Sequence, residues 1–222
     1  MKKVLLSGAT GKMGLEIQHI ISGENDLVLA KGFSKGDSLG DFTDNADLLI
    51  DFSNPDFFEQ ALEYCLKNNI AFISGTTGLL DKHFQQLSKA SESIAVLWAP
   101  NMSVGVHLMS EMFRVFEENK NFDFQIEEIH HKHKVDAPSG TAKFLQKQIE
   151  SHGIKTVDAP VALRGGGVFG VHQLFAFSEE EVLSIKHEAL NRTVFAKGAV
   201  RAAIWLAKQP KGLYEFKNVL GF

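Results

Sequence analysis

The strongest constraint on the fold is the alternation of short apolar segments with amphipathic segments over the first hundred residues. After the first apolar segment, apolar side chains recur at the spacing of a helix, at Met13, Ile17, Ile20 and Ile21. Strands that are apolar throughout and alternate with helices predict a parallel sheet covered by helices on both faces. The expected strands lie at residues 4–6, 27–30, 48–52, 70–74 and 94–98.

A glycine-rich turn joins the first expected strand to the first expected helix, with the sequence G-A-T-G-K-M-G. Glycines permit a tight turn and let backbone N–H groups approach a pyrophosphate at the positive end of a helix. We therefore expect a Rossmann-type domain that binds NADPH, NADH or both. The motif alone is weakly specific, and a glycine turn that binds nothing is the alternative. The expected contacts are Gly8, Ala9, Thr10, Gly11, Lys12 and Met13.

Three further loops follow expected strands, where ligands collect in open α/β sheets. Ser34 and Lys35 stand where an acidic residue would bind the ribose of NADH, so this pair predicts tolerance of, or preference for, NADPH. A solvated turn is the alternative there, and the nearby Asp37 complicates the interpretation. The other two loops are candidates to flank the nicotinamide, although plain strand-to-helix turns would look similar. They are Gly75, Thr76 and Thr77, and Ala99, Pro100, Asn101 and Met102.

The pattern changes after about residue 101. A helix carrying Val104, Leu108, Met112 and Val115 precedes expected strands at 124–129, 171–177 and 182–187. Strands joined by a short acidic turn suit an antiparallel or mixed sheet. We expect a dinucleotide-binding domain at 1–101, completed by a final helix within 192–222, and a second α+β domain at 102–191.

A cluster of histidines and lysines follows the expected strand at 124–129. In an extended segment His130, Lys132 and Lys134 would face one side, and His131 and His133 the other. Histidine suits proton handling near neutral pH, and lysine offers a positive charge beside a developing anion. A solvated basic strand end and a metal site are the alternatives, but the other ligands usual for zinc are not interleaved at ligand spacing, so no metal is expected.

The start of the next expected helix strengthens this assignment. Ser139, Gly140 and Thr141 open it, so exposed N–H groups and two hydroxyls would be available to hold a carboxylate. Cationic side chains beside a helix N-terminus form an anion pocket, which suits a small dicarboxylate substrate.

Composition bounds the remaining possibilities. The 222 residues carry a net charge of -4, which argues against nucleic acid as the main partner. A single cysteine, Cys65, excludes an intramolecular disulfide and fits a reducing compartment. No stretch approaches the length of a membrane span, and the apolar run near the N-terminus is too short for a signal peptide. We therefore expect a cytoplasmic protein without a membrane partner.

The residues from Glu128 to Ala142, E-I-H-H-K-H-K-V-D-A-P-S-G-T-A, closely resemble the signature of the dihydrodipicolinate reductases of lysine and diaminopimelate biosynthesis. Other pieces match in order along nearly the whole chain. They are G-A-T-G-K-M-G at Gly8, D-F-S at Asp51, G-T-T-G at Gly75, A-P-N-M-S-V-G-V at Ala99, L-R-G-G-G-V-F-G-V-H from Leu163 and F-A-K-G-A-V-R-A-A-I-W-L from Phe195.

This resemblance implies reduction of 4-hydroxy-tetrahydrodipicolinate, or its dehydrated form, by NADH or NADPH in a homotetramer built through the second sheet. By motif position, it implies that His130 donates or accepts a proton and that Lys134 donates one to the reduced intermediate. It also implies substrate contacts at His131, Gly140 and Thr141, beside Ser139. Ser34-Lys35 departs from the acidic–basic pair frequent in the family, which argues against strict NADH preference. Another NAD(P)-dependent dehydrogenase and a cofactor-sensing protein are the alternatives.

Overall fold

The computed structural model describes residues 1–119 and 121–222. The chain forms two compact units. One consists of Met1–Met102 and Phe195–Phe222, and the other of Ser103–Val194. Within the described residues, no helix is both long and apolar enough to cross a membrane.

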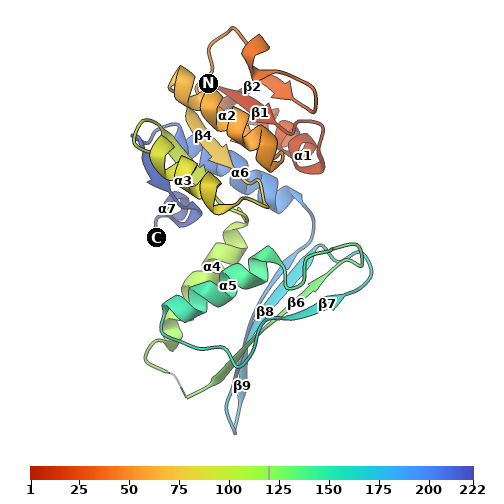
Figure 1. Ribbon diagram of the computed structural model, residues 1–222. Coiled ribbons are helices and arrows are strands. Elements are labelled where there is room, and N and C mark those ends of the chain that lie inside the picture. Colours follow the sequence, from red (N-terminus) through yellow and green to blue (C-terminus); the bar gives the residue numbers. More distant parts are fainter. Residues whose placement is uncertain (120) are drawn as a thin grey trace. The chain divides into compact units, whose positions relative to one another are not determined.

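The first unit contains a parallel six-stranded sheet with the order β10-β5-β4-β3-β1-β2 (Figure 1). β1 lies inside the sheet, with β2 on one side and β3 on the other, which is the doubly wound arrangement of nucleotide-binding domains. The strands are β1 (Lys2–Ser7), β2 (Leu27–Phe33), β3 (Leu48–Asp51), β4 (Ala71–Ser74), β5 (Ala95–Trp98) and β10 (Gly212–Tyr214).

Helices cover both faces of this sheet. On one face, alternate strand residues such as Leu5, Leu49 and Phe72 form a core with buried side chains of α2 and α3. The other strand residues, such as Val4 and Ile50, are equally buried, and α1 and α6 carry buried apolar residues of their own. The helical elements are α1 (Lys12–Ile21), η1 (Leu39–Asp41), α2 (Pro55–Asn68), α3 (Asp81–Ala90), α6 (Thr193–Leu206) and α7 (Phe216–Leu220).

The second unit contains a mixed four-stranded sheet with the order β7-β6-β8-β9. The pair β6 and β7 is parallel, and the pairs β6–β8 and β8–β9 are antiparallel. One face packs against α4 and α5 around a core that includes Phe124, Leu145 and Leu174. The elements are α4 (Val104–Met112), η2 (Phe113–Phe116), β6 (Asp123–His130), α5 (Gly140–Ser151), β7 (Val161–Arg164), β8 (Gly170–Phe177) and β9 (Val182–Ala189).

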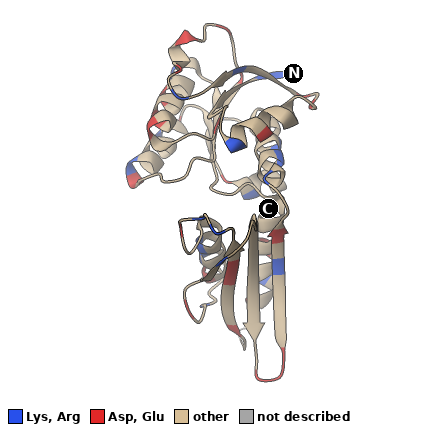
Figure 2. Ribbon diagram, turned by 90° about the vertical axis from the view of Figure 1, so that its right-hand side faces the viewer, with Lys and Arg blue, Asp and Glu red and all other residues tan. Residues whose placement is uncertain are grey.

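The opposite face of the second sheet carries exposed apolar side chains. Because side chains alternate along a strand and cross-strand partners share a face, Leu163, Val161, Phe177 and Val182 all lie on this outer face. Each of the four is more than a third exposed. Glu127, Lys186 and Glu188 share this face, and Figure 2 shows charged positions on the strands. We call this surface the outer face of the second sheet.

The expected fold class, a Rossmann-type parallel sheet with a second unit built on a mixed sheet, is confirmed. The expected strands of both units are also confirmed, with ends shifted by a few residues. Five elements were missed. They are the helix α3, which has few apolar residues, and the short elements η1, β7, β10 and α7.

The expected apolar stripe of α4 is wrong in its direction. Leu108, Met112 and Val115 are 47%, 52% and 63% exposed, whereas Met109 and Phe113 are buried. The segment carries apolar residues on both sides. Spacing alone therefore could not tell which side contacts the sheet.

Candidate active site

The glycine turn of the first unit has the geometry of a phosphate-binding loop. Gly8 has φ of +79°, and a Cβ atom there would lie 2.2 Å from the carbonyl oxygen of Phe52. A Cβ atom on Gly14 would lie 2.2 Å from the carbonyl oxygen of Gly8, so only glycine lets α1 start this close to the turn. Among the described residues no side chain caps α1 at Gly11, and its first turn has no acidic residue. The free N–H groups and positive helix end fit a cofactor pyrophosphate.

The residues of this turn differ in exposure. Ala9 is buried, whereas Thr10, Gly11 and Lys12 are exposed and Met13 is half-buried. The side chain of Gln18, on α1, donates to the Ala9 carbonyl at 2.8 Å and so links the turn to the helix that follows it.

A buried carboxylate ties neighbouring loops of this unit together. Asp51, at the end of β3, is fully buried and accepts a hydrogen bond from Ser7 Oγ at 2.6 Å, at the end of β1. It accepts two more from Ser74 Oγ at 2.8 Å and Thr76 Oγ1 at 2.7 Å, and another from Ser53 Oγ. The adjacent strand ends therefore share one anion, which satisfies the charge and fixes the loops that follow. Asp51 and these four hydroxyls are here called the Asp51 cage.

The Asp51 cage affects how the predicted cofactor loops are held. The hydroxyl of Thr76 is committed to Asp51, and its carbonyl accepts from the Trp98 indole at 3.0 Å, while Thr77 is exposed. The strands β4 and β5 are neighbours, so the loops that begin at Gly75 and Ala99 lie side by side.

The third predicted cofactor loop forms a tight turn after β2. The Asp37 carboxylate accepts from the backbone N–H of Ser34 at 2.7 Å, and Lys35 is exposed. Among the described contacts, the side chains of Ser34 and Lys35 form neither a hydrogen bond nor an ion pair. Both remain available to a ligand, as the NADPH prediction requires.

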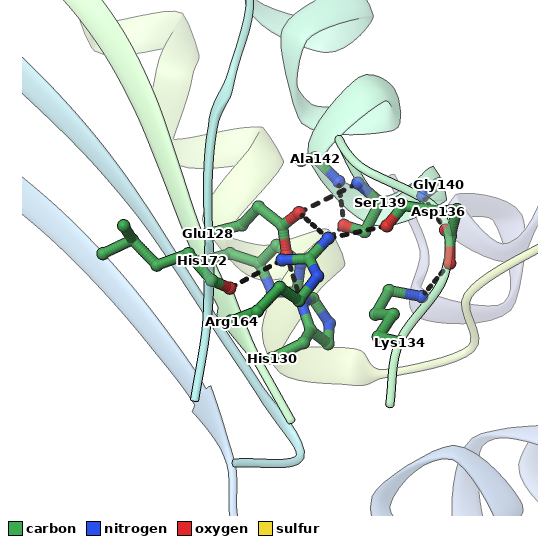
Figure 3. Close-up of polar contacts among 10 residues, drawn as sticks. Glu128, His130, Lys134, Asp136, Ser139, Gly140, Ala142, Arg164 and His172 are labelled. Carbon is green, nitrogen blue, oxygen red and sulfur yellow. Dashed lines mark hydrogen bonds and ion pairs between the residues drawn. The ribbon is translucent and has the colours of Figure 1, made fainter. Parts of the chain in front are cut away.

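In the second unit, β6 ends in a buried acid–base pair. Glu128 and His130 are two residues apart on the strand and point to the same face, where His130 Nδ1 hydrogen-bonds to Glu128 Oε2 (Figure 3). The other oxygen of Glu128 accepts from the Ser139 amide at 3.0 Å and from Arg164 Nη2 at 2.8 Å. Burial alone would raise the pKa of Glu128, but Arg164, Ser139 and His130 together hold it below its usual range. The carboxylate is therefore ionised.

A second carboxylate lies where the sequence predicts an anion pocket. Lys134 Nζ contacts the Asp136 carboxylate at 2.7 Å, and the Gly140 amide donates to the same side chain at 3.3 Å (Figure 3). A lysine ammonium and an N–H group at the start of α5 thus hold one carboxylate together. Burial tends to raise the pKa of Asp136, and the Lys134 interactions outweigh it and lower the pKa.

The N-cap of α5 is Ser139, as the sequence predicts. Its hydroxyl accepts from the Ala142 amide at 3.1 Å and lies 3.3 Å from Nε2 of His172 on β8. Burial, followed by the nearby His130, lowers the pKa of His172 to about 3, so this ring is neutral at physiological pH. The neutral His172 ring packs beside His130, with the two ring centroids 5.1 Å apart.

The extended geometry expected beyond His130 is wrong. The strand ends at His130, and the chain turns at once, with the Lys134 amide donating to the His131 carbonyl at 3.0 Å. The alternation of sides therefore stops at His130. Lys132 and His133 are exposed, whereas His131 and Lys134 are half-buried. Thr141, in the first turn of α5, is also half-buried.

Glu128, His130 and His172 place possible metal-ligand atoms within 4.8 Å of one another. Both oxygens of Glu128 are already bound by hydrogen-bond donors, one of them the Arg164 guanidinium. A permanent positive charge at 2.8 Å opposes binding of a second cation. The arrangement suits proton handling, and the absence of a metal stays a prediction.

Several residues of these clusters were not singled out from the sequence. Glu128, Arg164 and His172 lie within quoted motifs, but no role was given to them. The signal for Glu128 was its alternation with Phe124 and Ile126, which places an acid on the buried face of a strand. For Arg164 and His172 the signal is weaker, because β7 and β8 reach β6 only through the sheet pairing.

Family models cover nearly the whole chain. The model described as dihydrodipicolinate reductase, N-terminus, matches residues 2–102, and the model described as dihydrodipicolinate reductase, C-terminus, matches residues 102–220. A solved structure, the dipicolinate-bound dihydrodipicolinate reductase from Paenisporosarcina sp. TG-14, has the same fold. Its TM-score is 0.77 at 24% identity, over 97% of each chain.

Full-length relatives agree with the family models. The chain is 44% identical to the 4-hydroxy-tetrahydrodipicolinate reductase of Bdellovibrio bacteriovorus, over 98% of this chain and 96% of that one. It is 38% identical to the enzyme of the same name from Rickettsia rickettsii, over 99% of both. Together with the histidine motif and the two units, these matches show that the chain belongs to the dihydrodipicolinate reductase family.

Proposed function

We propose that this chain reduces 4-hydroxy-tetrahydrodipicolinate to tetrahydrodipicolinate with NADPH or NADH, with loss of the hydroxyl group as water, in the synthesis of diaminopimelate and lysine. One observation carries the proposal beyond family membership. Lys134 and the Gly140 amide hold a carboxylate, that of Asp136, close to the Glu128–His130 pair. One carboxylate of a dicarboxylate substrate would take the place of the Asp136 carboxylate at Lys134 and the Gly140 amide.

The first unit is proposed as the cofactor domain. Its glycine turn leaves no room for side chains at Gly8 and Gly14 and offers uncapped N–H groups at α1. The loops at 75–77 and 99–102 follow neighbouring strands and are proposed to flank the nicotinamide. Ser34 and Lys35 are proposed to contact the 2′-phosphate of NADPH, because both side chains are available, whereas the Asp37 carboxylate of the same turn is bound by the Ser34 N–H.

The second unit is proposed as the substrate domain. Lys134, with N–H groups of Gly140 and Thr141, would bind one carboxylate of the substrate, and His131 would contact another polar group. His130 would exchange a proton through Nε2, and Lys134 would donate a proton to the reduced intermediate. A bound nicotinamide supplies the hydride from its C4 atom. The protein contributes orientation and positive charge, which stabilise the anion that forms.

The second unit is also proposed as the site of assembly into a homotetramer. The outer face of the second sheet exposes Val161, Leu163, Phe177 and Val182, with Phe175 stacked on Phe177. Exposed apolar side chains of this kind are stabilised when a second copy covers them. A cytoplasmic location belongs to the same proposal, because the relatives are biosynthetic enzymes and Cys65 is a buried free thiol.

Binding of dipicolinate, a planar dicarboxylate that lacks a reducible imine, tests the anion pocket. Calorimetry should give saturable binding to the wild type and a loss of affinity of at least tenfold for Lys134→Ala. Lys132→Ala is the matched control, because Lys132 is an exposed neighbour of like charge. Equal affinity in the wild type and Lys134→Ala would contradict the proposed pocket.

A further inference from the structure

Glu128 is a buried charged group of the second unit whose two carboxylate oxygens both have partners. Its side chain is fully buried, and these partners come from different parts of the fold. Oε2 contacts His130 Nδ1 on the same strand, and Oε1 accepts from Ser139 at the start of α5 and from Arg164 on β7 (Figure 3). Burial of an ionised carboxylate destabilises the fold unless the charge is paired. Because Glu128 lies between His130 and the site proposed to bind a substrate carboxylate at Lys134, we expect its role to concern these residues.

We infer that Glu128 is a positioning residue, which fixes the tautomer and orientation of His130 and links that ring to the start of α5. The inference rests on the proposed function, in which His130 exchanges a proton with the substrate. The oxygens of Glu128 are enclosed by His130, Ser139 and Arg164, so the carboxylate acts through these partners and not on the substrate directly.

The tautomer follows from hydrogen-bonding chemistry. An ionised carboxylate only accepts hydrogen bonds, so Nδ1 of His130 must carry a hydrogen in the contact with Glu128. Nε2 is then the ring atom that can accept or release a proton. Among the described contacts Nε2 has no hydrogen-bond partner. A Cβ atom at Gly170 would lie 3.0 Å from Nε2, so the glycine there keeps this edge of the ring uncrowded.

Arg164 holds the carboxylate in place. Its Nη2 atom donates to Glu128 at 2.8 Å and to the Asp136 carbonyl at 2.6 Å, and Nη1 donates to the Leu163 carbonyl at 2.6 Å. The guanidinium therefore connects β7, β6 and the loop that carries Lys134. A planar donor group of this shape fixes the orientation of a carboxylate better than a flexible ammonium does.

The charges around His130 predict opposite effects for two substitutions. The groups that face the ring are Glu128 on β6, Arg164 on β7, His172 on β8 and Lys134 in the following loop. Burial lowers the pKa of His130 most, Glu128 raises it, and Lys134 and Arg164 lower it. Removing the charge of Glu128 should therefore lower this pKa, and removing that of Arg164 should raise it.

The test compares Glu128→Gln, Arg164→Gln and the exposed control Glu150→Gln on α5. In Glu128→Gln we expect kcat to fall by about a hundredfold, within the range typical of lost acid–base catalysis. The limb of the kcat/KM profile that reports His130 should move to lower pH in Glu128→Gln and to higher pH in Arg164→Gln. The KM for NADPH should stay unchanged in both. Folded variants whose limb does not move would overturn the inference.

A measurement on the wild type keeps the inference testable if a variant does not fold. Long-range ¹H–¹⁵N correlation spectra of ¹⁵N-histidine-labelled protein report which ring nitrogen carries hydrogen, with the His130 signal assigned through His130→Gln. We expect the Nδ1–H tautomer. The Nε2–H tautomer would overturn the inference even in a protein with full activity. Conversely, an Nδ1–H ring in a protein without turnover would leave the positioning intact and would contradict the proposed function.

Discussion

The Asp51 cage makes a quantitative prediction for the first unit. Asp51→Ala removes the acceptor of four hydroxyl groups, and three of these belong to the buried residues Ser7, Ser74 and Thr76. A buried donor without an acceptor costs about 1–3 kcal/mol. The three together should therefore lower the free energy of unfolding by about 3 kcal/mol or more, a large part of the ~5–15 kcal/mol typical of a folded protein.

Asp51→Asn removes the charge of the side chain but keeps nearly the same shape, so it separates the two contributions to stability. The amide keeps one carbonyl oxygen and replaces the other by a donor, which faces either Ser7 and Ser53 or Ser74 and Thr76. A hydroxyl can turn to accept from that amide, so we expect a smaller loss of about 1–2 kcal/mol. Either pair of hydroxyls borders a predicted cofactor loop, at Gly8 or at Gly75, so the affinity for NADPH should fall by more than tenfold in either orientation.

Urea unfolding followed by circular dichroism gives the stability, and NADPH fluorescence titration gives the affinity. Asp26→Asn is the control, since Asp26 is exposed in the same unit and should change neither quantity. An Asp51→Ala protein within about 1 kcal/mol of the wild type would refute the estimate, since three buried hydroxyls without an acceptor should cost more than that. Unchanged NADPH affinity in Asp51→Asn would refute the link between the cage and the cofactor loops.

Four further predictions concern single residues. Gly14→Ala should abolish NADPH binding in a titration, because its Cβ would lie 2.2 Å from the Gly8 carbonyl oxygen. Lys35→Ala should raise the KM for NADPH severalfold and leave that for NADH unchanged. Lys134→Ala should lower turnover far more than it weakens NADPH binding. His172→Asn should weaken the loss of stability in acid. Burial lowers the pKa of His172 from 6.5 to about 3, so between these values the unfolded chain binds a proton that the folded protein does not. The free energy of unfolding of the wild type should therefore fall by about 1.4 kcal/mol for each pH unit below 6.5.

Each of these predictions has a contrary result. NADPH binding retained in Gly14→Ala would show that the turn does not approach the pyrophosphate. Parallel changes for both cofactors in Lys35→Ala would exclude a phosphate contact. Equal losses of turnover and NADPH binding in Lys134→Ala would place the lysine outside the substrate site. A His172→Asn protein with the acid slope of the wild type in urea unfolding would contradict a neutral buried ring.

The first unit was predictable because its signals are local. The inner strands β1, β3, β4 and β5 are largely buried on both faces and so appear as apolar runs, and the glycine turn marks the start of α1. α3 was missed because its apolar residues are few: Phe84, Leu87 and Ala90 are its apolar side chains, and Phe84 is 39% exposed. The strand β10 has three residues and joins the sheet edge beside β5, which no local pattern predicts.

In the second unit, local sequence patterns predicted the start of α5 but not the side chains that surround Glu128. The helix start at Ser139 was predictable from the serine and the following apolar spacing, and it is confirmed. The side chains that organise the pocket were not, because Arg164 and His172 reach Glu128 through strand pairing across long sequence separations. The bend after His130 has no glycine or proline next to it, so the extended interpretation of the histidine run was reasonable and wrong.

The most direct test of the proposed function is a coupled assay in which dihydrodipicolinate synthase makes the substrate from pyruvate and aspartate semialdehyde. Oxidation of NADPH and of NADH is followed separately at about 340 nm, the absorption band of the reduced nicotinamide. We predict oxidation that depends on the synthase and its substrates, faster with NADPH at equal low concentrations, and strongly reduced in Lys134→Ala. A folded protein that binds NADPH but oxidises neither cofactor in this assay would contradict the proposed function.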